Sequence, residues 1–177
     1  MFFDLLKERR SIRKYEERDV EKEKEDIILK SALLAPSSRS RRPWEFIAVT
    51  DREVLKKLSM CREHSSAFLK EAPLGIVVIA NPDACDVWIE DCSIASIVIQ
   101  LSAHSLGLGS CWVQVRERFY KDDIKAGDYI KDILNVPDKY VVESIIAIGY
   151  PDEKKSAHDE KELAYEKIHF NEYESNE

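Results

Sequence analysis

The sequence predicts a single α+β domain over residues 1–177. Three short runs rich in β-branched and aromatic residues predict strands at residues 44–50, 74–80 and 141–149. Between these runs, apolar residues recur at helical spacing, most extensively over residues 86–106. No internal repeat or linker separates the elements, and the chain is long enough to bury a core. These observations together favour one α+β unit.

The first half of the chain alternates charged loops with short helices. The charged run 16–26 predicts a loop that leads into a helix, and helical apolar spacing over 27–35 ends at Pro36. After the first strand, Asp51 suits the N-cap of a second helix. A short helical piece then stops at Pro73.

The second half should form the core. Residues 74–80 are continuously apolar, which indicates a strand buried on both faces. The helix over 86–106 carries apolar residues on most faces, so we expect it to be central, and the glycines of 107–109 should end it. Residues 110–115 suit a strand or an extended loop. Residues 117–134 predict a mostly polar helix interrupted by one glycine.

The tail from residue 150 onward is charged and contains few apolar residues, which are Tyr165, Ile168, Phe170 and Tyr173. A segment of this composition cannot bury enough apolar surface to fold alone. We therefore expect residues 150–177 to form an arm that packs on its own subunit or on a partner.

Composition and charge exclude several classes of function. A net charge of −7 argues against a nucleic-acid or anionic membrane surface, and no apolar run is long enough to span a bilayer. Charged residues interrupt the apolar start of the chain, so we expect no signal peptide and a cytoplasmic protein. No metal-ligand spacing is present, and the cysteines are expected to be reduced and partly buried: Cys61, Cys85, Cys92 and Cys111.

The segment Arg9-Arg10-Ser11-Ile12-Arg13-Lys14-Tyr15 concentrates cations and a hydroxyl in an otherwise acidic protein. Before it, Phe2, Phe3, Leu5 and Leu6 are spaced to share one helical face, which would anchor the segment against a core. Anchored guanidiniums beside a hydroxyl suit recognition of a phosphate or another planar anion. A solvated basic turn is the alternative interpretation of these residues taken alone.

Five features occur in a fixed order: the basic segment, Pro36-Ser37-Ser38, Pro43-Trp44, Gly107 to Trp112, and Gly149-Tyr150-Pro151 followed by lysines. In this order and at these separations, the set resembles the nitroreductase family of FMN-dependent flavoproteins, in a short form and over nearly the whole chain. The resemblance implies a sandwich with a central, mostly antiparallel sheet flanked by helices. It also implies an intertwined homodimer with FMN, bound noncovalently, at the subunit interface, and the arm would then lie across the partner.

The resemblance assigns the phosphate end of FMN to basic residues at both ends of the chain. Arg9 and Ser11 match the family residues that hold the phosphate, and Arg10 is expected to contact the ribityl or phosphate region. Lys154 and Lys155 lie where the family supplies a further cation to the phosphate. A solvated charged tail is the alternative for these two lysines.

The resemblance also assigns the flavin ring. Arg13 matches a cation near N1 and O2, where a positive charge favours the reduced flavin. The backbone amide of Gln114 is the candidate donor to N5. Gly109, which has no Cβ, lets this segment of the chain approach the flavin closely. Ser65 lies where a polar contact to the pyrimidine edge is common in the family. The segment along the ring is Trp112, Val113 and Gln114.

A serine loop is expected to reach the flavin of the other subunit, through Pro36, Ser37, Ser38 and Ser40. Here the chain departs from the family, because Ser40 replaces an Asn and Arg42 replaces a Gln. Ser40 can still make a local bond to the backbone. Ile97 and Val98 stand where the family often has Glu-Asn, and Gln114 and Val115 stand where glycines are common, which leaves the substrate range open.

The implied function is hydride transfer from NAD(P)H through FMN to nitroaromatics, quinones or similar small acceptors, in a ping-pong cycle without an acid–base residue. Two alternatives stand beside it. One is a specialised relative, such as a flavin-dependent dehalogenase or a flavin-cleaving enzyme, although no lid insertion is visible. The other is a flavin-binding protein of low turnover. Cys111 and Asp91 are expected to have packing and structural roles.

Overall fold

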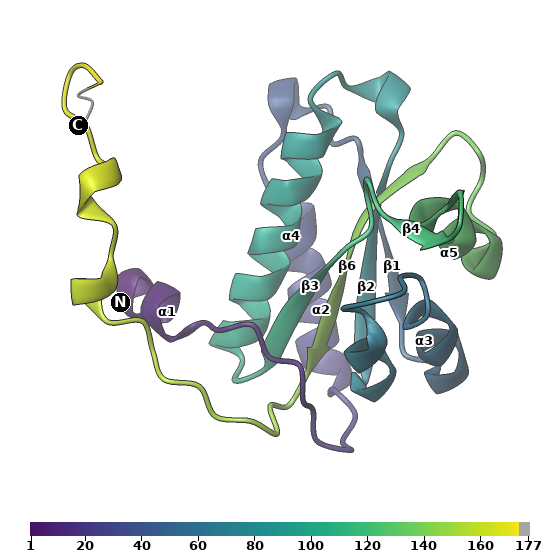
Figure 1. Cartoon of the computed structure of the whole chain (residues 1–177), viewed down its shortest axis with the longest axis horizontal. Coiled ribbons are helices and arrows are strands. Elements are labelled where there is room, and N and C mark those ends of the chain that lie inside the picture. Colours follow the sequence, from purple (N-terminus) through teal and green to yellow (C-terminus); the bar gives the residue numbers. More distant parts are fainter. Residues whose placement is uncertain (174–177) are drawn as a thin grey trace.

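The computed structural model describes residues 1–173 and contains a four-stranded sheet with the order β1-β2-β6-β3. All three strand pairs are antiparallel, as the register of each pair shows. The strands are β1 (Trp44–Val49), β2 (Leu74–Ala80), β3 (Gly109–Gln114) and β6 (Val141–Gly149). The predicted α+β class and the mostly antiparallel sheet are confirmed (Figure 1).

Helices cover both faces of this sheet (Figure 1). One layer is formed by α2 (Lys22–Leu33) and α4 (Trp88–Ser105), and the other by α3 (Arg52–Leu58) and α5 (Ala126–Leu134). Because side chains alternate along β2, Ile76 packs toward the first layer and Val77 toward the second. Every residue of β2 is buried, as the continuous apolar run predicts. The sheet therefore separates two apolar cores.

The prediction that the helix over 86–106 is central is wrong for the single chain. This helix, α4, begins at Trp88 and packs with α2 on one face of the sheet. Two of the apolar side chains that suggested a central position, Ile94 and Ile97, are exposed. Its expected end is confirmed, because Gly107 adopts the left-handed conformation with φ of 77°.

Residues 117–134 do not form one helix. A short hairpin of β4 (Phe119–Lys121) and β5 (Ile124–Lys125) precedes α5. Asp122 turns the hairpin with a φ of 49°, a conformation that short polar residues tolerate better than most. The turn was not predicted because charged residues are spread evenly over this stretch and give no local signal that interrupts a helix.

The remaining elements are short. The helix α1 (Phe2–Glu8) has no buried residue, and Phe2 is 65% exposed, so the expected anchoring of α1 against a core is wrong for the single chain. The predicted helical piece before Pro73 is the 3₁₀ helix η2 (Ala67–Glu71). The other 3₁₀ helices are η1 (Ser38–Ser40), η3 (Pro82–Ala84), η4 (Glu160–Glu162) and η5 (Tyr165–Lys167).

The arm leaves the sheet after Pro151 and runs to α1 (Figure 1). There the backbone N–H of His158 donates to the carbonyl of Lys7 at 3.0 Å, and Lys7 pairs with Glu160 at 2.9 Å. The four tail residues expected to need a surface are exposed, and Phe170 is 79% exposed. Within residues 1–173, no helix combines the length and the apolar character needed to span a membrane.

A β-bulge in β6 brings a carboxyl group into the core. The pairing of β2 with β6 skips Glu143, so its side chain lies toward α4, where Ser93 Oγ donates to Oε1 at 3.3 Å. Glu143 is 3% exposed, and its Oε2 has no hydrogen-bond partner among the described residues. Burial raises the pKa of this carboxyl above its usual range, so the fold favours the neutral form.

The burial of Glu143 predicts a pH-dependent effect of Glu143→Gln. Because the folded chain binds this proton more tightly than the unfolded chain, the contribution of Glu143 to stability is largest at acid pH and is lost as pH rises through the raised pKa. As the pH is raised from about 4 to about 8, the free energy of unfolding of the variant should therefore increase relative to that of the parent, by an amount on the order of 1 kcal/mol. Urea unfolding at both pH values measures this gain. The control is Glu23→Gln, at an exposed position of α2 away from Glu143, and an equal effect of Glu143→Gln at both pH values contradicts the prediction.

Candidate functional site

The basic segment lies along the edge strand β3. Ser11 forms a parallel bridge with Ser110, and the N–H of Ile12 donates to the carbonyl of Ser110 at 2.9 Å. Ile12 and Tyr15 are buried, and Tyr15 Oη donates to the carbonyl of Ile12 at 2.6 Å. The arginines are thus fixed by Ile12 and Tyr15, which face inward, and not by α1.

Two glycines make this close approach possible. A Cβ at Gly109 would lie 2.8 Å from the side chain of Ile12, and a Cβ at Gly149 would lie 2.9 Å from the ring of Tyr15. Neither distance is tolerable for a real side chain. The expected close approach at Gly109 is therefore made by the basic segment itself, which packs on the strand.

Four cations converge on a cavity of about 350 Å³, which we call the basic cavity. Arg9 and Arg10 come from the N-terminal segment, and Lys154 and Lys155 come from the root of the arm. Gly109 and Ser110 also line the cavity, together with His104 and the carboxylates Glu8 and Glu153. The structure thus brings together the cations that the sequence analysis assigned to one phosphate.

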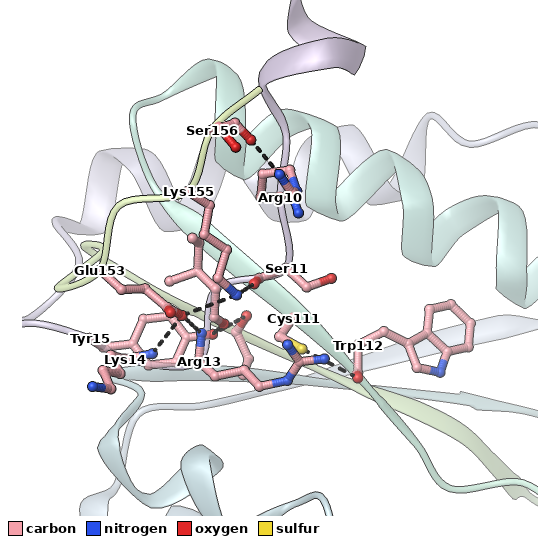
Figure 2. Close-up of polar contacts among 12 residues, drawn as sticks. Arg10, Ser11, Arg13, Lys14, Tyr15, Cys111, Trp112, Glu153, Lys155 and Ser156 are labelled. Carbon is pink, nitrogen blue, oxygen red and sulfur yellow. Dashed lines mark hydrogen bonds and ion pairs between the residues drawn. The ribbon is translucent and has the colours of Figure 1, made fainter. Parts of the chain in front are cut away.

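Hydrogen bonds hold the root of the arm against the basic segment (Figure 2). Lys155 Nζ donates to the carbonyl of Ser11, and Arg10 donates to the carbonyl of Ser156. Glu153 accepts from the N–H of Arg13 at 2.6 Å, and this contact is the main reason why the pKa of Glu153 lies below its usual range. A freely solvated position for Lys155 does not fit these contacts.

A second cavity of about 490 Å³ lies farther along β3, and we call it the tryptophan cavity. The residues that line it are Arg13, Arg62, Ser65, Phe68, Trp112 and Gln114. Trp112 Nε1 donates to Gln114 Oε1 at 2.9 Å, and Gln114 Nε2 donates to the carbonyl of Arg116 at 2.8 Å. The ring of Trp112 is therefore held in one orientation along the wall of the cavity.

The two cavities lie along one strand edge. Ser110 lines the basic cavity and Gln114 lines the tryptophan cavity, so they are separated by roughly 13 Å at about 3.3 Å per residue. The basic segment contributes to both, through Arg9 and Arg10 on one side and Arg13 on the other. Val113, between them, is buried in the core, so only its backbone can serve the site. The arrangement suits an elongated molecule with an anionic end and an aromatic end.

The serine loop lines neither cavity. Ser38 N–H donates to Asp91 Oδ1 at 2.9 Å, near the start of α4, whereas His104 near the end of α4 lines the basic cavity. At about 1.5 Å per residue, these points are roughly 20 Å apart. The loop of Pro36 and Ser37 thus lies away from the basic cavity of its own chain, and its predicted contact with a flavin of the other subunit stays a prediction.

The serine loop is nonetheless well fixed. Three of its residues, Arg39, Ser40 and Arg42, have positive φ angles of 51°, 54° and 49°. The local side-chain bond expected of Ser40 is made instead by Ser37, whose Oγ accepts from the N–H of Arg42 at 2.9 Å. The Asp91 carboxylate, which is 2% exposed, accepts from this loop, and its expected structural role is confirmed.

The cysteines fit packing roles. All four are free and buried. Burial raises the pKa of the Cys111 thiol despite the nearby Arg13 and Lys155, so the thiol form is favoured. Among residues 1–173, no cluster of His, Cys, Asp and Glu is arranged to hold a metal ion.

Sequence reasoning missed Arg62. Its guanidinium lines the tryptophan cavity, and Nη1 donates to the carbonyl of Gln114 at 3.3 Å. In the sequence, Arg62 stands beside Glu63 and His64 and has the appearance of an ordinary surface residue. No local signal could have connected it with β3.

Comparisons with known proteins agree with this architecture. The sequence profile described as the nitroreductase family matches residues 6–61 and 58–150. A solved structure named FMN-dependent nitroreductase, from Clostridium difficile R20291, is 59% identical with a TM-score of 0.95, covering 97% of this chain and 99% of that one.

Two further relatives carry provisional names as NADH dehydrogenase/NAD(P)H nitroreductase. The one from Archaeoglobus fulgidus is 40% identical over 155 residues, which are 85% of this chain and 86% of the relative. The solved structure from Parabacteroides distasonis is 35% identical with a TM-score of 0.87, covering 97% of this chain and 98% of that one. The chain belongs to the nitroreductase family of oxidoreductases.

Proposed function

We propose that this chain is an FMN-dependent oxidoreductase that takes hydride from NAD(P)H and reduces nitroaromatics, quinones or similar small acceptors in a ping-pong cycle. The observation that carries the proposal is the pair of cavities along β3, one basic and one aromatic, joined by the basic segment. The names of the relatives support the same cofactor and the same donor. The free, buried cysteines fit a cytoplasmic location.

The residues present fit FMN. Arg9, Arg10, Lys154 and Lys155 would hold its phosphate, because charge-assisted hydrogen bonds to guanidinium and ammonium groups suit that group. The hydroxyl of Ser11 would add a contact at the same end. The ribityl chain would follow β3 toward the tryptophan cavity, whose volume of about 490 Å³ leaves room for an aromatic ring system.

At the ring end, three residues have separate tasks. The guanidinium of Arg13 would lie near N1 and O2, the backbone amide of Gln114 would face N5, and Ser65 would contact the pyrimidine edge. Because β3 is an edge strand, part of its backbone N–H groups can face a ligand. Arg13 also lies over the ring of Phe68 at 5.8 Å, which limits its motion.

When bound, FMN supplies the redox chemistry, accepting hydride from NAD(P)H and passing two electrons to the acceptor. The chain binds and orients the cofactor and sets the charge around it. Within the described residues, the lining of the tryptophan cavity contains no carboxylate and no histidine. The proposal therefore assigns no side chain of this cavity to proton transfer.

Exposed apolar side chains support a homodimer with interfacial sites. They lie on α1, on the outer face of α4, at the end of α2 and on the arm, where Phe3, Ile97, Leu34 and Ile168 are examples. A second copy would cover these surfaces, and the arm would lie across it. The serine loop of one chain would then complete the flavin site of the other.

The first test is the colour of the purified protein. We expect a yellow protein that is bleached anaerobically by NADH or NADPH, and whose colour returns when a quinone or a nitroaromatic is added. Visible spectra and mass spectrometry of the released cofactor measure this. A colourless protein that takes up no FMN contradicts the proposal. A yellow protein that neither nucleotide bleaches would instead be the low-turnover binder, and turnover confined to halogenated phenols would indicate a dehalogenase.

Arg9→Ala should weaken FMN binding by about 1.5–3 kcal/mol, the usual range for a hydrogen bond to a charged group. Calorimetric titration of the apoprotein with FMN measures the loss. Arg52→Ala is the matched control, because this exposed arginine of α3 pairs with Asp19 away from both cavities. Equal affinities of Arg9→Ala and the parent would remove Arg9 from the site.

A chain that ends after Ala157 should form a weaker dimer while it keeps Lys154 and Lys155, because it loses the exposed apolar side chains of the arm, such as Ile168 and Phe170. Sedimentation equilibrium over a dilution series measures the dissociation constant, for which we expect an increase of at least tenfold. The double variant Lys161→Gln/Glu162→Gln, which keeps the apolar side chains, should dimerise like the parent. A shortened chain with an unchanged constant would show that the arm is not part of the interface.

A further inference from the structure

Two guanidiniums share the tryptophan cavity without a carboxylate. Arg13 and Arg62 both line it, and the rest of the lining is Ser65, Phe68, Trp112 and Gln114. Within residues 1–173, neither arginine forms an ion pair, although the chain has 34 acidic residues against 27 basic ones. Like charges in one cavity repel each other, so the pair is stabilised when a negative charge enters.

The backbone of Arg62 is fixed by the turn that follows α3. Cys61 and Ser66 are buried on either side, and Ser66 Oγ donates to the carbonyl of Ser59 at 2.8 Å and to that of Arg62 at 3.3 Å. The side chain of Arg62 then crosses to β3, where Nη1 donates to the carbonyl of Gln114.

This single bond leaves most of the Arg62 guanidinium available. A guanidinium carries five N–H donors, and within the described residues only one of those of Arg62 forms a hydrogen bond, to the carbonyl of Gln114. The bond is also at the strand position whose backbone amide is the candidate donor to N5. Arg62 therefore holds a fixed positive charge next to the place where the flavin ring would lie.

We propose that Arg62 is a second cation of the flavin site, which acts with Arg13 to favour the reduced cofactor over the oxidised one. This inference rests on the proposed function. FMN that takes up two electrons and one proton gains one net negative charge, which is carried at the pyrimidine end of the ring. Two guanidiniums in one cavity stabilise that charge more than one does, because each adds a favourable Coulombic interaction in a partly desolvated place.

The competing role for Arg62 is a purely structural tie that keeps the end of β3 in place. The two roles predict different results. A structural tie, once lost, weakens oxidised and reduced FMN alike. A second cation, once lost, weakens the reduced form more and so lowers the midpoint potential of the bound cofactor.

The test compares Arg62→Gln, Arg62→Lys and the control Arg52→Gln, each loaded with FMN. Equilibration with a reference dye gives the midpoint potential, and titration of the apoprotein gives the affinity for oxidised FMN. For Arg62→Gln we expect the preference for reduced over oxidised FMN to fall about tenfold, which lowers the potential by about 30 mV for two electrons. Arg62→Lys keeps the positive charge but loses the planar guanidinium group, so the potential of its bound FMN should stay near that of the parent. The potential of the control Arg52→Gln should also stay near that of the parent.

The inference is overturned if the potential of Arg62→Gln equals that of the parent, or if Arg62→Lys shifts as far as Arg62→Gln. Circular dichroism checks that the variants fold, and should Arg62→Gln not fold, Arg62→Met takes its place, because it also removes the charge and keeps an unbranched side chain. A parent protein that binds no FMN overturns the proposed function and this inference together. A parent that is yellow and reducible, with an unchanged Arg62→Gln potential, overturns only the role of Arg62.

Discussion

The contact between Ile12 and Gly109 fixes the position of the three arginines of the basic segment, Arg9, Arg10 and Arg13. Because Gly109 has no Cβ, Ile12 packs directly on the edge strand, and the basic segment follows it in extended form. With Ile12 facing inward, Arg9 and Arg10 lie at one cavity and Arg13 lies at the other. A larger residue at either position would shift the whole segment, so a contact between two apolar groups determines the electrostatics of the site.

Much of the fold could be predicted because its signals are local. The apolar runs of β2 and β6 and the glycine that ends α4 need no knowledge of distant residues. The hairpin before α5 was missed because its turn depends on the left-handed conformation of Asp122, which has no periodic signal. The placement of α1 was wrong because apolar spacing shows that a face needs cover but does not show what covers it.

Some residues of the candidate site could likewise be predicted from the sequence, and others could not. The order of motifs was enough to group Arg9 with Lys154 and Lys155, which the structure places at one cavity although they come from opposite ends of the chain. Arg62 could not be found in this manner. Its importance depends on a turn that brings it to Gln114 on another strand, and its neighbours in the sequence are typical of a solvated surface.

The lysines of the basic cavity stand at the root of the arm, and this position has a consequence for the assembly. Lys155 is held by Ser11 and Glu153, and the same stretch of chain continues into the segment that contacts α1. If the proposed function holds, a partner subunit that immobilises the arm also preorganises Lys154 and Lys155 for contact with the phosphate. By thermodynamic reciprocity, cofactor loading would then tighten subunit association by the same factor by which association tightens loading. Apoprotein and holoprotein would differ in how readily their subunits exchange.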